Sequence, residues 1–424
     1  MSRRSGSVEN TVEVTGGLRR HTRGDEKARC RVLVPFFTPF LYGMERAVIE
    51  IFDALRPGVR PHFVQSYMIT QRRPPIIEEM SRRGFEMSLL PDKKDWVKIG
   101  RPRSLRQLCA MLLELTRGNI AVLKAARGKD VLYVPGISYA HFCILAALRL
   151  RLLGRRVVHH FHDLGTRTLS FPLWIWLVTD FVHNTQFSYE VVTRALPGIK
   201  RKRNIVVPYI IDLERPTVED QVADSPLLLG RNIFSVGQVS RHKGIDLLLE
   251  AFKTIAATFP DVTLHLVGAC APDFKQELEQ AISKPPLAGR VKCWGFREDS
   301  LRLLRSAYLH VHPSPPSRFH ESFGRSVVEA MALGVPTVCF RSGALQEIVV
   351  HEKTGLICDE IPSSLGTAMD RFLSDVDFRN DCGRNARQRY EERYSSQVVR
   401  QIWAEFFLPP ATPFISKTET TPDR

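Results

Sequence analysis

The amino-acid sequence predicts an α/β protein of two domains, each with a parallel β-sheet covered by helices on both faces. The chain has 424 residues, which is enough for two domains of roughly 200 residues each. Short apolar runs alternate with helical patterns along most of the chain, and this order is typical of a parallel sheet covered by helices. The alternation stops over residues 213–230 and then restarts, so we expect this segment to link the two domains.

The first half of the sequence begins with an apolar run at residues 30–37, followed by a loop containing Gly43 and a helix that ends near Leu55. Strand, loop and helix in this order begin a doubly wound unit, in which ligands bind at the carboxyl ends of the strands. Further strands are expected at residues 62–69, 85–90, 131–134, 157–162, 181–184 and 205–211. The longest helices of this half are expected at residues 104–126 and 138–153.

The second half repeats the pattern. Strands are expected at residues 232–237, 263–268, 290–296 and 335–340. Helices are expected at residues 245–259 and 323–333, as a pair within 370–394, and at 397–407.

Composition and charge limit the class of protein. Hydrophobic residues make up 44% and charged residues 25% of the chain, as in ordinary globular proteins. The net charge of +15 indicates an anionic partner. No nucleic-acid-binding motif is present, so we expect nucleotide phosphates or anionic lipid and no nucleic acid. The eight cysteines are scattered without a C-x-x-C pair, which favours a reducing cytoplasm over a disulfide framework or structural zinc.

The two ends of the chain look unstructured. Residues 1–28 are rich in Ser, Gly, Arg and Thr and lack the apolar segment of a signal peptide. We expect disordered tails at residues 1–28 and 409–424. The most apolar run, at residues 169–182, contains Asp180 and is too short to span a membrane, which takes about 20 residues.

The most informative stretch is residues 310–340, which reads as strand, polar loop, helix and strand. Its loop ends at Glu321 and leads to a helix N-terminus, where unpaired N–H groups suit a phosphate. Glu329 follows eight residues later, about 12 Å along a helix, which is near the span from a sugar across a diphosphate to a ribose. Glu329 also has apolar neighbours, so its carboxylate needs a partner, and a ribose diol would serve. The alternative is two ordinary surface glutamates on an amphipathic helix.

Glu321-Ser-Phe-Gly-Arg-Ser-Val-Val-Glu-Ala-Met-Ala-Leu-Gly-Val-Pro336 resembles the signature of retaining nucleotide-sugar glycosyltransferases of family 4, the group 1 transferases. The resemblance implies that Glu321 faces the donor sugar and that Glu329 holds the ribose hydroxyls. It also implies that backbone amides after the Phe-Gly pair face the sugar and the phosphate. The donor-binding positions carried over in this way include Phe323, Gly324, Ser326 and Val327.

A second motif, Gly237-Gln-Val-Ser-Arg-His-Lys-Gly244, resembles the family's Gly-Arg-Leu-x-x-x-Lys-Gly element. In that element an arginine and a lysine grip the donor diphosphate, as stabilisation of a leaving group requires. Lys243 matches the lysine, whereas Gln238 stands where the arginine belongs. Glutamine can donate a hydrogen bond but carries no charge, so Arg241 and Arg325 are candidates to supply the missing cation.

Three further positions carry weaker signals. In His159-His-Phe-His-Asp163, strand alternation puts His160 and His162 on one face. The resemblance implies that His162 reaches toward the acceptor and the sugar, while a satisfied core histidine is the alternative. A metal site has no supporting carboxylate or cysteine spacing, so we expect none.

Two loops also resemble parts of the family's site. Gly43 resembles part of the acceptor-side loop, which usually has two glycines. The turn at Phe296 resembles the turn that faces the nucleotide base.

The resemblance implies the GT-B fold, two Rossmann-like domains facing across a cleft. The acceptor domain is expected at residues 29–212, the donor domain at 231–393, and a terminal helix at 394–408 that packs back on the first domain. The expected reaction moves a sugar from a nucleotide-diphosphate sugar to a glycan or lipid-linked acceptor, with retention and without metal or cofactor. The expected location is the cytoplasm, at the inner face of the membrane.

Two other functions stay open. Gln238 motivates a non-catalytic regulator that binds a nucleotide sugar, and a sugar-nucleotide epimerase has a similar fold. Basic segments occur at residues 198–204 and along the helix with Arg106 and Arg117. These basic segments form either an ordinary solvated surface or a docking site for an anionic membrane.

Overall fold

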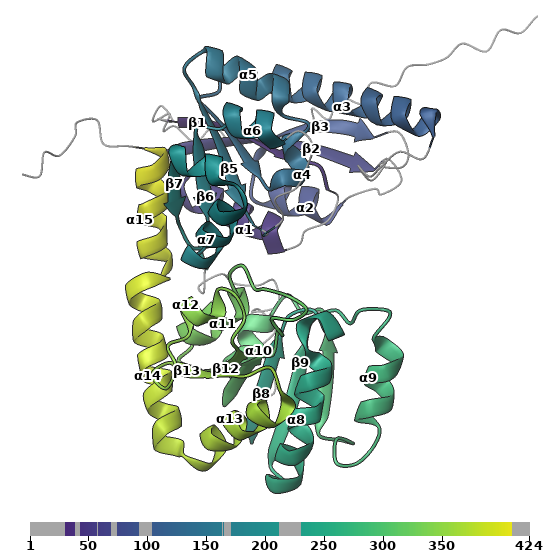
Figure 1. Ribbon diagram of the computed structural model, residues 1–424, viewed down its shortest axis with the longest axis vertical. Helices are drawn as coiled ribbons and strands as arrows, with labels where there is room; N and C mark the ends of the chain where they lie inside the picture. Colours follow the sequence, from purple (N-terminus) through teal and green to yellow (C-terminus); the bar gives the residue numbers. More distant parts are fainter. Residues whose placement is uncertain are drawn as a thin grey trace, which may run out of the picture.

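The computed structural model describes residues 30–38, 43–56, 58–68, 74–92, 104–162, 164, 171–211 and 230–408. The predicted tails, and all but the last residue of the predicted linker, lie outside these residues. The described chain forms two parallel sheets with helices around each, one above the other in Figure 1. The structure therefore has the predicted fold of two Rossmann-like domains.

The first sheet has seven strands in the order β3-β2-β1-β4-β5-β6-β7. Their bounds are β1 Cys30–Phe36, β2 Val59–Met68, β3 Glu86–Asp92, β4 Val131–Pro135, β5 Arg156–Phe161, β6 Asp180–His183 and β7 Arg203–Val206. Val32, Leu33 and Val34 of β1 are all fully buried, because helices cover both faces of a parallel sheet. The chain order reverses between β1 and β4, and such a switch point opens a crevice at the carboxyl ends of the strands.

The helices of this domain are α1 Gly43–Ala54, α2 Pro75–Arg82, α3 Leu105–Ala125, α4 Ile137–Ala140, α5 Ile144–Leu152, α6 Phe171–Leu177 and α7 Gln186–Ala195. The prediction of one helix at residues 138–153 was wrong, because the chain breaks between α4 and α5. Asn119 of α3 donates a hydrogen bond to the carbonyl of His141 and accepts one from the amide of Leu145, at 2.8 and 3.1 Å. These two bonds satisfy backbone groups at the break. The strand predicted at residues 205–211 ends at Val206, two residues before Pro208, which lacks an N–H to donate.

The second sheet has six strands in the order β10-β9-β8-β11-β12-β13. Their bounds are β8 Arg231–Val236, β9 Val262–Val267, β10 Val291–Gly295, β11 Leu309–His312, β12 Thr337–Phe340 and β13 Gly355–Cys358. The helices are α8 Ile245–Thr258, α9 Lys275–Ile282, α10 Ser300–Leu304, α11 Arg325–Ala332, α12 Leu345–Ile348, α13 Pro362–Ser374, α14 Val376–Arg393 and α15 Ser396–Phe407. The order switches between β8 and β11, so this sheet also has a crevice at its carboxyl edge.

The last helix completes the core of the first domain. Figure 1 shows α14 beside the second domain and α15 beside the first. Trp403 of α15 is fully buried in the hydrophobic cluster of the first domain. Its indole N–H donates to the carbonyl of Pro208 at 3.2 Å, and Arg156 of β5 donates to the carbonyl of Phe406 at 2.8 Å. The end of the described chain therefore ties the two domains together.

Candidate active site

A cavity of about 700 Å³ lies between the two domains. Gly43 and Arg46 of α1 form its wall on the side of the first domain. The rest of the lining comes from the second domain, at the carboxyl ends of β8, β9, β10 and β11 and the starts of α8, α10 and α11. This is the edge where doubly wound sheets bind their ligands.

Most of the residues singled out in the sequence line this cavity. They are Gly43, Gly237, Gln238, Lys243, Phe296, Glu321, Gly324, Ser326 and Glu329. Phe323 and Val327 do not line it, and both side chains are buried in a separate apolar cluster. The ring of Phe323 packs edge-on against Tyr209 of the first domain, with centroids 4.8 Å apart. Phe323 therefore anchors the start of α11 against the first domain.

Glu321 is the centre of a buried polar cluster. Three side chains hydrogen-bond to Glu321 Oε1. Lys243 Nζ donates to it at 2.5 Å, Ser314 Oγ donates to it at 2.8 Å, and His312 Nε2 lies 2.9 Å from it. Burial by itself would raise the pKa of Glu321, but His312 and Lys243 outweigh it and hold the pKa well below its ordinary value. Glu321 is therefore a carboxylate at neutral pH, and Lys243 is bound to it.

Glu329 belongs to a second charged cluster, which joins the domains. Its Oε1 accepts a hydrogen bond of 2.8 Å from Arg325 Nε. The other side of the same guanidinium donates to both carboxylate oxygens of Glu50 in α1, at 2.8 and 3.2 Å. Burial lowers the pKa of Arg325, but Glu50 and Glu329 raise it above its ordinary value. The partner that the apolar surroundings of Glu329 require is therefore Arg325.

Two helix N-termini meet at the cavity. Gly324 precedes α11 with φ +80°, and a Cβ there would lie 2.6 Å from Leu345 Cδ2, so this turn requires glycine. The first N–H groups of a helix have no acceptor within it, and Gly324 and Ser326 place those of α11 at the cavity wall. The helix α1 begins at Gly43 on the opposite wall. Both helix ends favour negative charge.

His162 lies outside the cavity lining. Its Nδ1 is 2.6 Å from the hydroxyl of Tyr209, and its ring centroid is 3.9 Å from that of His160. The two histidines share a face, as the alternation predicted. Burial, followed by the neighbouring His160 and His159, holds the pKa of His162 well below its ordinary value. A neutral His162 therefore belongs to a buried polar cluster of the first domain, and its carbonyl accepts a hydrogen bond from Ser322 at 2.9 Å.

His312, Ser314 and Arg46 also line the cavity, although the sequence motifs indicated no role for these three residues. His312 and Ser314 lie at the carboxyl end of β11, and their position at a strand end was a usable signal. Arg46 lies on the other domain, and local patterning holds no information about that contact. Arg241, a candidate for the missing cation, instead pairs with Glu277.

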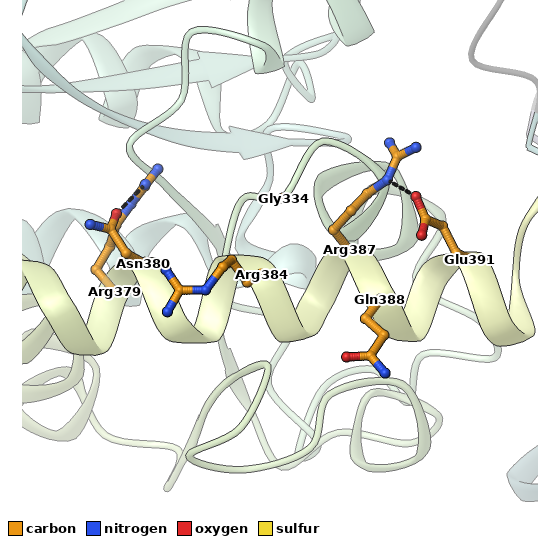
Figure 2. Close-up of a pocket in the computed structure, with 8 residues that line it drawn as sticks. Gly334, Arg379, Asn380, Arg384, Arg387, Gln388 and Glu391 are labelled. Carbon is orange, nitrogen blue, oxygen red and sulfur yellow. Dashed lines mark hydrogen bonds and ion pairs between the residues drawn. The ribbon is translucent and has the colours of Figure 1, made fainter.

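A second hollow, of about 440 Å³, lies along α14 (Figure 2). Figure 2 shows Arg387 paired with Glu391, and Arg379 beside Asn380. Arg387 Nε donates to Glu391 Oε1 at 2.7 Å, and Arg379 donates to Asn380 Oδ1 at 3.0 Å. None of the predicted site residues lines it. Among the described residues no group of three or more His, Cys, Asp or Glu is placed to hold a metal ion. Nor does any described helix combine the length and apolar character that crossing a membrane requires.

Comparison with known proteins agrees with the resemblance in the donor-side motifs. Residues 229–389 match the family model for glycosyl transferases group 1. An uncharacterized glycosyltransferase, MJ1607 of Methanocaldococcus jannaschii, is 34% identical over 166 residues, covering 38% of this chain and 41% of the relative. The D-inositol 3-phosphate glycosyltransferase of Corynebacterium urealyticum is 30% identical over 202 residues, covering 46% of each chain. In both alignments the chain spans less than half the length of the relative.

Solved structures share the whole fold. The Anabaena protein Alr3699/HepE, in complex with UDP and glucose, has a TM-score of 0.68 at 21% identity, covering 89% of this chain and 99% of that one. WaaG, a glycosyltransferase involved in lipopolysaccharide biosynthesis, has a TM-score of 0.60 at 15% identity, covering 89% and 100%. These neighbours have the GT-B fold, so the predicted fold class is confirmed.

Proposed function

We propose that this protein is a retaining glycosyltransferase that moves a sugar, of hexose type, from a nucleotide-diphosphate sugar to an acceptor. The observation that carries the proposal is the cavity between the domains. It has the Glu321 carboxylate and the Glu329 carboxylate in its wall, and two helix N-termini face it from opposite sides. This arrangement matches a ligand with a sugar at one end, a ribose at the other and a diphosphate between them.

Each part of the donor has a partner in the lining. The diphosphate lies at the start of α11 and near Lys243, and the ribose hydroxyls bind Glu329. Phe296 is 64% exposed at the cavity wall, so the turn that carries it is open to a nucleotide base. Glu321 faces the sugar. Support comes from the Anabaena neighbour of the same fold, which was solved in complex with UDP-glucose.

The reaction follows from these charges. As the bond from the anomeric carbon to the diphosphate breaks, negative charge grows on the diphosphate and positive charge on the sugar. Lys243 and the N–H groups of α11 stabilise the negative charge on the diphosphate, and the Glu321 carboxylate stabilises the positive charge on the sugar. The acceptor oxygen bonds to the anomeric carbon on the face from which the phosphate leaves, and an oxygen of that phosphate takes the hydroxyl proton, so the step needs no separate protein base. The proposed reaction uses no metal. Closure of the domains excludes water, which would otherwise attack the sugar.

The donor site predicts that Glu329→Ala weakens binding of the nucleotide sugar by about tenfold, as expected for loss of hydrogen bonds to a charged group. Thermal shift with UDP-, GDP- and ADP-sugars measures this on native and variant protein. The matched control is Glu250→Ala, because Glu250 is an exposed glutamate on α8. Stabilisation by one donor in the native protein and in the control, but less in Glu329→Ala, supports the proposal. Absence of stabilisation by every donor contradicts it.

The acceptor is proposed to be a glycan or lipid-linked precursor, met at the inner face of a membrane. The surface of the first domain formed by α3, α5 and α6 is the docking surface. It combines exposed apolar side chains with arginine and lysine, and its most exposed apolar residues are Leu105 at 76%, Leu152 at 79% and Trp176 at 62%. Amphipathic surfaces of this kind bind anionic bilayers.

Basic side chains and exposed apolar side chains lie next to each other on this surface. Lys202, from the basic segment at residues 198–204, donates to the carbonyl of Trp176 at 3.2 Å. Burial lowers the pKa of Lys202, and the nearby Arg151 of α5 lowers it further. The basic segment therefore adjoins both α5 and α6, where an anionic headgroup would meet it.

Membrane docking predicts that the protein sediments with liposomes containing anionic lipid and is released at high salt, because salt screens exposed charges. The double variant Trp176→Gln, Leu152→Gln is expected to lose most of this binding. The control is Ile361→Gln, which removes an exposed apolar side chain of the second domain. Equal sedimentation of all three proteins, or none that depends on salt, contradicts a membrane partner.

A further inference from the structure

The cavity is lined by four arginine or lysine side chains, and three of them are already bound to carboxylates. Lys243 is held by Glu321. The other pairs join Arg297 to Asp299, and Arg325 to Glu50 and Glu329.

The fourth is Arg46, in the first turn of α1. Within the part of the chain that the structure describes, its guanidinium has no hydrogen bond and no ion pair. Arg46 is therefore the cation of this cavity that is ready to receive an anion.

The second domain lacks a cation where one is needed. Gln238 lines the cavity at the motif position that resembles an arginine site, and its amide carries no charge. Arg241 pairs with Glu277 on α9 and does not line the cavity. Arg325 lines it but is committed to two carboxylates. Lys243 remains, but it is shared with Glu321, so the second domain offers a bound diphosphate no cationic side chain of its own that is free of a carboxylate partner.

The structure also explains why Arg46 is held over the cavity. Arg46 and Glu50 are four residues apart on α1, so their side chains share one face of that helix. Glu50 binds Arg325 at the start of α11. The ion pair fixes the face of α1 that carries Arg46 against the helix whose N-terminus faces the same cavity.

We infer that Arg46 of the first domain binds the donor diphosphate and supplies the positive charge that Gln238 does not. This inference rests on the proposed function, because it assigns a residue to the donor site. Its consequence is that the two cations which stabilise the leaving group come from different domains: Lys243 from the second and Arg46 from the first. Full stabilisation then requires both domains to be in place.

The test is a charge-relocation experiment measured by isothermal titration calorimetry. The probes are UDP, GDP and ADP, followed by the monophosphate and the free nucleoside of whichever base binds. Arg46→Gln is expected to weaken binding of the nucleoside diphosphate by about tenfold or more and to leave the affinity for the free nucleoside unchanged. The double variant Arg46→Gln, Gln238→Arg is expected to recover most of the loss, because it returns a cation to the same phosphates from the other wall.

Two controls separate this role from a structural one. Arg384→Gln removes an exposed arginine of α14 and is expected to bind the diphosphate like the native protein. Arg46→Lys keeps the charge and is expected to retain most of the affinity. Unchanged diphosphate binding in Arg46→Gln, an equal loss for the nucleoside, or failure of Gln238→Arg to rescue would overturn the inference alone. Failure of the native protein to bind any of the three diphosphates would overturn the proposed function as well.

Discussion

Replacing Arg325 with methionine is expected to destabilise the protein by about 2 kcal/mol, less than the cost of removing one member of a fully buried ion pair, because the Arg325 side chain is still 26% exposed. The guanidinium binds Glu50 of α1 and Glu329 of α11. Methionine fills similar space but leaves two negative charges close together, and the side chain of Glu50 is only 5% exposed. Urea denaturation followed by tryptophan fluorescence measures the change.

The design includes a control and a second variant. Arg384→Met breaks an exposed pair with Asp381 on α14 and is expected to cost no more than about 1 kcal/mol. Glu50→Gln in the Arg325→Met background is expected to regain part of the stability, because it removes one of the stranded charges. Equal stability of Arg325→Met and Arg384→Met would show that the link between the domains contributes little.

Glu321→Gln is expected to lower sugar transfer by about 100- to 1000-fold while donor affinity changes much less. Glutamine keeps the shape of the side chain but removes the negative charge that faces the positive charge developing on the sugar. Release of the nucleoside diphosphate, measured in an extract that supplies acceptors, gives the rate, and thermal shift gives donor binding. The control is Glu250→Gln, on the exposed face of α8.

The outcomes separate enzyme from regulator. Loss of turnover in Glu321→Gln with binding retained supports the catalytic role. If the native protein binds a donor but turns over none, while Gln238→Arg does, the non-catalytic regulator becomes the better description. If Glu321→Gln turned over as fast as the native protein, Glu321 would have no catalytic role.

The lowered pKa of Glu321 makes the stability of the folded protein depend on pH. In the folded protein this pKa lies below its ordinary value of 4.5. The contribution of Glu321 to stability is therefore complete above about pH 4.5 and is lost as the pH falls toward the folded pKa. The stability difference between the native protein and Glu321→Gln should stay constant from pH 6 to 8 and shrink in acid.

Local patterns in the sequence were enough for the fold. Apolar runs of strand length, each followed by a helical pattern, predict parallel sheets because the period of the pattern follows from backbone geometry. The restart of the pattern near residue 231 predicts the second sheet, which begins at Arg231. The Glu321 to Glu329 motif and the Lys243 loop predict a phosphate-binding edge, and both lie at one cavity. Each of these signals lies within a short stretch of chain.

Local patterns failed where backbone groups are satisfied by distant segments. The helix predicted at residues 138–153 is broken between α4 and α5, at the place where Asn119 of α3 binds backbone groups on both sides of the break. The strand predicted at residues 205–211 stops early, and Pro208 instead presents its carbonyl to Trp403 of α15. In both cases the partner lies on another helix, so no periodicity near the break could indicate it.

The two α/β domains and the donor-side motifs can be predicted from the sequence, because these features depend on residues close together in the chain. The pairing of charges in the site follows from how the chain packs in three dimensions. Glu50 and Arg325 are 275 residues apart, and Lys243 and Glu321 are 78 apart. Arg46 meets the cavity from the opposite domain. The pairing of charges depends on distances in space, and packing of the two domains against each other sets those distances.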